Sequence, residues 1–374
     1  MDADGNAFGS PRDTLIMIET QSLEAVHRSL GATLANDGIP LHYGDLAVEY
    51  HAAHETAVIM DRSHEGRLTI TGRDRLAVLH RISTNHLERL THGEGAPTVF
   101  TNANARILDR ATVYHRGDEA LLTAEPGRGS ALRAYLQRSI FFNDEARISD
   151  LADSTRQFAI HGVKADESIA ALLPDAQSIP AYGHRTIEID GAALFIGRRA
   201  ALIGSAWTVI APTSAAGIVW SRLTAAARPA GSLAYNILRV EAGRPGGGRE
   251  LTEQYIPLEV SLWDEVSFNK GCYTGQEIIA RMESRGRIAR TIVCLHLNSA
   301  VDAPTALLSD GREVGTLTSS AQLPDGVHIG IGIVKIGEAR IGRRFTTPNG
   351  AAVEITRLPG AQPPFGLDSE PTSD

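Results

Sequence analysis

The amino-acid sequence predicts an α+β fold that is divided into more than one domain. Between residues 41 and 288, short strand-like runs are interspersed with segments whose apolar residues recur at helical spacing. Beyond Arg290 every predicted element is a strand, and turns such as 310–311 (Asp-Gly) and 349–350 (Asn-Gly) separate the strands. A chain of 374 residues is long for one domain, so two or three domains are expected.

Composition narrows the class of protein. Hydrophobic residues make up 43% of the chain, which is enough for real cores, and the net charge of −8 argues against a nucleic-acid partner. A local basic site for an anionic ligand remains open. Two cysteines cannot form a Cys-rich metal site or cluster, so no metal is expected. Low cysteine use fits a reducing compartment, and residues 1–12 lack the apolar run of a signal peptide or membrane span. We therefore expect a cytoplasmic protein without a membrane partner.

The first part of the chain mixes helices and strands. Apolar residues recur at helical spacing over residues 15–34, and Gly38 is expected to lie beyond the end of that helix. A second helix is predicted over residues 46–54, and residues 68–71 alternate like a half-buried strand. Residues 72–74 (Gly-Arg-Asp) then open another helix. The remaining elements predicted here are a meander of strands over 99–123 and a helix over 130–139.

The rest of the chain continues this mixture and then becomes all β. The predicted strands cover 157–160, 186–189, 193–196, 207–210, 292–297, 306–308, 313–318, 329–334 and 353–355, and the predicted helices cover 167–173, 214–226 and 231–243. Cys294 lies in an apolar strand and is predicted to be a core residue. Residues 246–248 (Gly-Gly-Gly) look like a phosphate loop, but no strand precedes them and no Lys-Ser/Thr follows. We interpret them as a flexible turn that can cover a ligand.

One stretch carries chemistry. Residues 270–277 read Lys-Gly-Cys-Tyr-Thr-Gly-Gln-Glu and contain Cys272, one of only two cysteines. Thr274 and Glu277 have the spacing of a capping box, which predicts a helix start at this point. The ammonium of Lys270 and the positive end of that helix would both favour the thiolate form of Cys272. The alternative is that Cys272 is a small buried hydrophobe in a turn bracketed by glycines.

This octapeptide resembles the signature of YgfZ-like proteins, the folate-binding branch of the glycine-cleavage T-protein superfamily. The likeness continues through residues 278–281 (Ile-Ile-Ala-Arg), 285–286 (Arg-Gly) and Arg290, and eight consecutive residues with one Cys are a specific signal. Further upstream, the Tyr-Gly turn at 43–44 and the Thr-Asn pair at 84–85 also resemble the superfamily. The resemblance spans residues 41–358.

The resemblance implies a fold and a domain organisation. The expected fold is the three-domain T-protein arrangement, with a central ligand channel and a C-terminal antiparallel β-barrel. The expected parts are an N-terminal helix with a loose start (1–40), an interleaved α+β folate-binding domain (41–150 with 231–288), a second α+β domain (151–230), the β-barrel (289–358) and a disordered tail (359–374).

The resemblance also implies a tetrahydrofolate site. T-proteins carry an acid where this chain has Asp109, and that acid handles the proton of the folate N10; the alternative is a solvent-facing Asp on a strand. Arg239 matches a T-protein arginine at the folate, because a guanidinium suits the carboxylates of the folate tail. Its alternative is an ordinary helix-face salt bridge. The same likeness makes further folate-binding candidates of Tyr43, Asn85, Lys270, Gln276, Arg281 and Arg290.

The chain differs from T-proteins in one acidic motif, at residues 201–208. T-proteins carry a Gly-Tyr-Thr-Gly-Glu-Asp-Gly pattern, followed by a Glu that contacts the pterin ring. Residues 201–208 of this chain read Ala-Leu-Ile-Gly-Ser-Ala-Trp-Thr, so these acids are absent. A folate held in the T-protein orientation is therefore less expected.

Two functions of different classes follow from the resemblance. The first is a tetrahydrofolate-binding factor for the maturation of iron–sulfur proteins, with Cys272 as its reactive group and iron–sulfur assembly proteins as partners. The second is a tetrahydrofolate-dependent enzyme that uses Asp109, either an aminomethyltransferase-like one-carbon transferase or a demethylase acting on a small methylated amine. Residues 270–277 favour the first function, whereas Asp109 and Arg239 favour the second.

Overall fold

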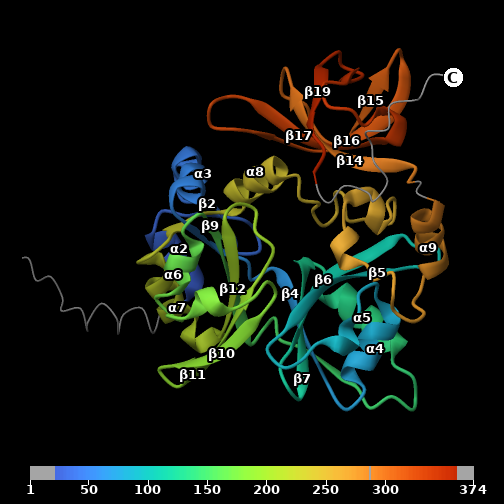
Figure 1. The fold of residues 1–374 in the computed structure, drawn as a ribbon. Helices are drawn as coiled ribbons and strands as arrows, with labels where there is room; N and C mark the ends of the chain where they lie inside the picture. The colour runs from blue at the N-terminus through green and yellow to red at the C-terminus, as the bar shows by residue number, and fades with distance from the viewer. Residues whose placement is uncertain (1–21, 286–287, 360–374) are drawn as a thin grey trace, which may run out of the picture.

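The computed structural model describes residues 22–285 and 288–359. Figure 1 shows two separate β-sheets below a β-barrel, with most helices on the outer faces of the sheets. The C-terminal barrel is closed and has the strand order β14-β17-β16-β15-β18-β19. This architecture confirms the α+β fold with a C-terminal antiparallel barrel. No helix within the described residues is long and apolar enough to cross a membrane.

The first large sheet has six strands in the order β10-β11-β12-β9-β3-β13. Its strands are β3 (Val58–Asp61), β9 (Thr155–Gly162), β10 (His184–Ile189), β11 (Ala192–Arg198), β12 (Ser205–Pro212) and β13 (Arg228–Pro229). Helices α2 (Leu23–Ser29), α6 (Ala165–Ile169) and α7 (Ala216–Thr224) pack on it around the buried rings of Trp207 and Trp220. Strand β3 is buried along its whole length, because Ile59 packs into one hydrophobic core and Val58 and Met60 pack into another on the opposite face.

The second large sheet has five strands in the order β5-β6-β7-β4-β8. Its strands are β4 (Glu65–Thr71), β5 (Gly95–Thr101), β6 (Ile107–His115), β7 (Glu119–Pro126) and β8 (Arg147–Asp150). Helices α4 (Arg75–Ile82) and α5 (Gly129–Ser139) cover one face, where Leu79, Phe100 and Leu136 form part of the core. Two short links join the sheets: residues 62–64 between β3 and β4, and residues 151–154 between β8 and β9. Side chains on the first of these links, such as Arg62 and His64, therefore lie where the sheets meet.

The remaining elements connect the sheets to the barrel. A short hairpin of β1 (Thr33–Leu34) and β2 (Pro40–His42) precedes α3 (Leu46–Glu55), which packs against α8 (Ser232–Ala242). Helix α8 lies between the six-stranded sheet and the barrel (Figure 1), and it contacts β16 and β17. Helix α9 (Gln276–Arg285) precedes the barrel strands β14 (Arg290–Leu297), β15 (Thr305–Ser309), β16 (Arg312–Gln322), β17 (His328–Lys335), β18 (Arg344–Thr346) and β19 (Ala352–Arg357).

Two predictions about helix ends are wrong. The helix predicted over residues 15–34 is described only from residue 22 and ends at Ser29, because Gly31 has a φ of +84° and the chain then enters β1. Residues 1–21, where that prediction begins, lie outside the described residues. The capping box of Thr274 and Glu277 does not form, because α9 starts at Gln276. Instead, the Gln276 side chain accepts a hydrogen bond from the Tyr273 amide at 3.3 Å.

Candidate functional site

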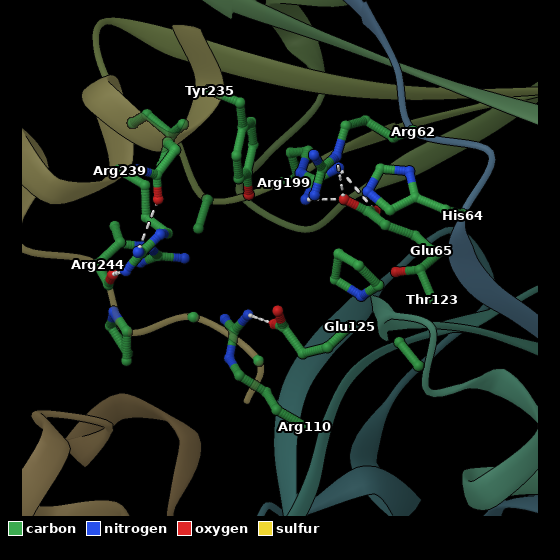
Figure 2. Close-up of a pocket in the computed structure, with 18 of the residues that line it drawn as sticks. Arg62, His64, Glu65, Arg110, Thr123, Glu125, Arg199, Tyr235, Arg239 and Arg244 are labelled. Atoms are coloured by element: carbon green, nitrogen blue, oxygen red, sulfur yellow. Dashed lines mark hydrogen bonds and ion pairs between the residues drawn. The ribbon is translucent and has the colours of Figure 1, made fainter. Parts of the chain in front are cut away.

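A cavity of about 240 Å³ lies where the two sheets and α8 meet. The link 62–64, Glu65 at the start of β4 and strands β6 and β7 form one side, and Arg199, which follows β11, forms another. Helix α8 and the loop 244–249 close it (Figure 2). Gly246 and Gly247 line the cavity, so the glycine turn predicted to cover a ligand does lie over a hollow. Residues from four distant parts of the chain thus converge on one site.

The cavity is strongly cationic. Its charged lining residues are six arginines and two glutamates: Arg62, Arg110, Arg199, Arg239, Arg244, Arg249, Glu65 and Glu125. Two further buried carboxylates, Glu250 and Glu265, pair with lining arginines from behind. Positive charge remains in excess, so the cavity suits a ligand that carries negative charge.

Arg110 on β6 forms the floor of the cavity. Its guanidinium donates to both carboxylate oxygens of Glu265, at 2.6 and 2.7 Å, and to one oxygen of Glu125 at 3.3 Å. Burial alone would lower the pKa of Arg110, but Glu265 outweighs it and raises that pKa above its ordinary value. The second oxygen of Glu125 has no hydrogen-bond partner among the described residues. Glu125 can therefore accept hydrogen bonds from a ligand.

Glu65 occupies the opposite wall and is already satisfied. It accepts hydrogen bonds from Arg62 at 2.8 Å and from Arg199 at 3.2 and 3.3 Å, and the Gln157 amide also donates to it. Burial would raise the pKa of Glu65, but Arg199 and Arg62 lower it to about 2. The carboxylate is charged at neutral pH and fixes both guanidinium groups (Figure 2). These residues shape the wall and leave no free acceptor on Glu65.

Arg239 lines the cavity, but its guanidinium is hydrogen-bonded to other groups of the protein. Its side chain donates to Glu250 at 3.2 Å, to the Arg244 carbonyl at 3.0 Å, to Asn236 at 2.9 Å and to Ser319 at 3.0 Å. Four of its five N–H groups are used in this way. The salt-bridge alternative therefore describes the guanidinium better than a direct folate contact does. Arg239 ties α8 to the following loop and to the barrel.

Asp109, the predicted proton-handling acid, does not line the cavity. It pairs across β5 with Phe100, which belongs to the core beneath α4 and α5, whereas its neighbour Arg110 pairs with Val99 and points to the cavity. Side chains alternate along a strand, so the two residues occupy opposite faces of the sheet. The Asp109 carboxylate bonds Arg128 at 3.0 Å, and burial raises its pKa to about 6. Its structural role is an ion pair on the helical side of the sheet.

Residues 270–277 lie apart from the cavity. Cys272 is exposed, so the alternative of a buried hydrophobe is not supported. Lys270, however, is buried and donates to the carbonyls of Ser83 at 2.5 Å, Asn85 at 3.1 Å and His80. Burial lowers the pKa of Lys270 to about 8, so its ammonium is still charged at neutral pH. Its charge holds the motif to the end of α4, and the idea that it activates Cys272 is not supported.

The other predicted folate contacts also lie away from the cavity. The Tyr43 hydroxyl bonds His27 at 2.8 Å, and the Asn85 amide donates to Pro97 at 2.7 Å. Gln276 begins α9, and Arg281 is exposed on that helix. Arg290 bonds Glu259 at 3.2 Å beside the barrel. None of these residues lines the cavity.

Arg239 and the glycine turn are the lining residues that the sequence singled out. The other charged residues of the lining were missed, among them Glu65, Arg110, Glu125, Arg199 and Arg244. Strand alternation offered one usable signal, because it places Arg110 and Thr112 together on the face opposite Asp109. For the loop residue Arg244 no local periodicity exists.

A second cavity, of about 610 Å³, lies between α2 and α7 and contains the buried pair of His27 and Asp61. Ser22 and Leu23, at the edge of the described residues, form part of its rim. The cationic cavity is bounded entirely by residues well inside the described ranges, and we treat it as the candidate site.

The GCVT N-terminal domain family matches residues 25–270, which is well over half of the chain. The chain belongs to the T-protein superfamily. A chloroplastic protein of Arabidopsis thaliana that is named, but not established, as a transferase is 32% identical to this superfamily member over 345 residues, which are 91% of this chain and 80% of the relative. An aminomethyltransferase of Herpetosiphon aurantiacus is 28% identical over 331 residues, covering 86% of this chain and 91% of the relative.

The fold of this T-protein superfamily member matches a solved structure. The crystal structure of the glycine cleavage system aminomethyltransferase T from Bartonella henselae superposes with a TM-score of 0.81 at 21% sequence identity. The match covers 92% of this chain and 99% of that one. The predicted T-protein-like arrangement is thereby confirmed as a fold.

Proposed function

We propose that this T-protein superfamily member is a YgfZ-like protein that binds a reduced folate in the cationic cavity. The observation that carries the proposal is that one cavity holds both a free carboxylate acceptor and a free guanidinium donor. Glu125 offers a free carboxylate oxygen, and Arg244 offers a guanidinium that no described carboxylate pairs. A pterin ring presents N–H donors that suit a carboxylate, and the glutamyl end of a folate presents carboxylates that suit a guanidinium. The residues therefore fit a folate, although the pterin-contacting Glu of T-proteins is absent.

The same geometry favours a role in iron–sulfur protein maturation over aminomethyl transfer. When bound, a reduced folate supplies a carrier for one-carbon units. A transferase of the T-protein kind is expected to hold an acid beside the folate, but here Asp109 faces the helices and Arg110 faces the cavity. The likeness of residues 270–277 to the YgfZ-like signature and the exposure of Cys272 support the maturation role. Iron–sulfur assembly proteins would then be its partners.

An aminomethyltransferase-like activity, or a demethylase activity, is the alternative. It is favoured by the relatives named aminomethyltransferases, which match most of the chain. It requires another group in the cavity to take the part of the acid, and Glu125 is the carboxylate there with a free oxygen. Turnover with glycine-derived aminomethyl donors would favour this alternative over the maturation role.

Calorimetry tests folate binding. Tetrahydrofolate and its methylene and formyl forms are titrated into the purified protein and into Glu125→Gln, which keeps the shape but weakens the acceptor. We expect saturable micromolar binding of at least one form to the wild type. Loss of a charged hydrogen bond in the variant should weaken it by roughly 1.5–3 kcal/mol. Absence of binding heat for every form would reject the folate proposal.

Complementation tests the maturation role separately. The gene is expressed in a cell that lacks its own homologue, and the activity of an iron–sulfur enzyme is measured. The wild type should restore activity and Cys272→Ser should not, whereas Cys294→Ser, at the buried cysteine, serves as the matched control. Full rescue by Cys272→Ser would remove the thiol from the proposed function.

A further inference from the structure

Arg244 has a backbone fixed by the end of α8. Gly243 takes a left-handed conformation, with a φ of +69°, and ends the helix. The Arg244 amide then donates to the Arg239 carbonyl at 3.0 Å, and the Arg244 carbonyl accepts from the Arg239 guanidinium at 3.0 Å. These two bonds fix the point from which the Arg244 side chain departs. That side chain lines the cavity (Figure 2).

The Arg244 guanidinium has no carboxylate partner among the described residues. Within those residues, Arg62, Arg110, Arg199 and Arg239 each pair with a glutamate. Arg249, the sixth lining arginine, is exposed and reaches the Ala303 carbonyl at 3.3 Å. Arg244 is partly buried and close to a second positive charge: burial, and then the charge of Arg110, lower its pKa below the ordinary value, and the nearby carboxylate of Glu265 offsets this only in part. A buried cation without a counter-ion is costly unless a ligand supplies the missing charge.

We infer that Arg244 binds an oxyanion of the cavity's ligand, a carboxylate or a phosphate, as a two-pronged donor. Arg110 adds positive charge from the floor, but its guanidinium is held by Glu265 and Glu125. Arg244 therefore has the donors to spare, and its planar fork matches the two oxygens of such a group. The inference rests on the proposed function only in one respect: if the ligand is a folate, the oxyanion is a glutamyl carboxylate. Otherwise it belongs to a separate small anion.

Binding measurements on two matched variants test this inference. Arg244→Gln removes the charge from the cavity, and Arg249→Gln makes the same change at its exposed rim. The probes are tetrahydrofolate, tetrahydropterin (which lacks the glutamyl carboxylates), p-aminobenzoylglutamate and inorganic phosphate, each followed by calorimetry. Thermal unfolding of both variants checks folding, and Arg244→Gln should be no less stable than the wild type, because it removes an unpaired buried charge.

If the oxyanion is the glutamyl carboxylate, tetrahydrofolate should bind Arg244→Gln about 10- to 100-fold more weakly, with little change in Arg249→Gln. Tetrahydropterin should bind both variants as it binds the wild type. If the wild type binds no folate but binds phosphate through Arg244, the inference stands and the proposed function fails. Unchanged affinity of Arg244→Gln for every anionic probe would overturn the inference. An equal loss of affinity of Arg244→Gln for tetrahydropterin would also overturn it, because Arg244 would then support the cavity wall and would not bind the oxyanion.

Discussion

At the scale of single residues, the cavity is defined by which charges are paired. Glu65 is saturated by protein partners, and Arg110 is held in place by Glu265 and Glu125, so these residues fix the geometry. Glu125 keeps one free oxygen and Arg244 keeps its whole guanidinium, so these two are free to meet a ligand. Charged hydrogen bonds are the strongest kind that the protein can offer, and a ligand with matching groups at its two ends can use both.

The buried carboxylate of Asp109 should make the stability of the protein depend on pH. Its pKa is about 6 in the folded protein and 3.8 ordinarily, so the folded state binds more protons between these pH values. Stability from this group is present below pH 3.8 and is lost as the pH rises through 6. The Asp109→Asn variant cannot ionise at this position and does not lose this stability. Its free energy of unfolding, relative to that of the wild type, should therefore rise by up to about 3 kcal/mol between pH 4 and pH 7.5.

Denaturant unfolding at the two pH values checks this prediction. Asp118→Asn, in the exposed turn after β6, is the control and should change stability by less than about 0.5 kcal/mol at either pH. If Asp109→Asn showed no pH-dependent gain over the wild type, Asp109 would have to be ionised in the fold throughout this range, and the burial argument would be wrong.

The two cysteines make a prediction about accessibility. Cys272 is exposed, whereas Cys294 is buried in the barrel, where burial raises the pKa of its thiol. Alkylation needs a thiolate that the reagent can reach, so the folded protein at neutral pH should be labelled at Cys272 well before Cys294. Mass spectrometry of a labelling time course separates the two sites. Equal and slow labelling would show that Cys272 is protected and would argue against a reactive role.

At the scale of elements, the strands account for both a success and a failure of prediction. The meander of strands predicted over residues 99–123 is confirmed by β5, β6 and β7. Strand alternation places Asp109 and Arg110 on opposite faces, so the acid chosen by family likeness lies on the face away from the cavity. Strand β3 was missed, because a short strand buried on both faces shows no alternation.

Two glycines of the motif give a matched test at this scale. Gly275 has a φ of +85°, and a Cβ there would lie 2.7 Å from the Asn102 carbonyl oxygen, in the turn between β5 and β6. Gly271 has open space around it and no positive φ. Gly275→Ala should therefore lower the free energy of unfolding by about 1–3 kcal/mol, whereas Gly271→Ala should change it by less than about 0.5 kcal/mol. Chemical denaturation of both variants measures the difference. Equal stability of the two would mean that the motif does not pack on this turn.

At the scale of the whole molecule, the chain is acidic but its central cavity is cationic. The net charge is −8, yet six arginines line one hollow. The fold was predictable because the octapeptide 270–277 and short upstream motifs, such as those at 43–44 and 84–85, are typical of one superfamily. The cavity was not, because it is assembled from the 62–64 link, strands of one sheet, a residue beyond β11, and helix α8 with the loop after it. Such long-range pairing leaves no local pattern in the sequence.

The most direct test of the central claim is a crystal structure of the protein with tetrahydrofolate. We predict electron density for the ligand in the cationic cavity, with the pteridine ring at Glu125 and a glutamyl carboxylate at Arg244. The Arg239 guanidinium should keep its bonds to Glu250 and Ser319. Folate bound elsewhere, for example beside Arg290 at the barrel, with the cavity free of ligand, would contradict the account.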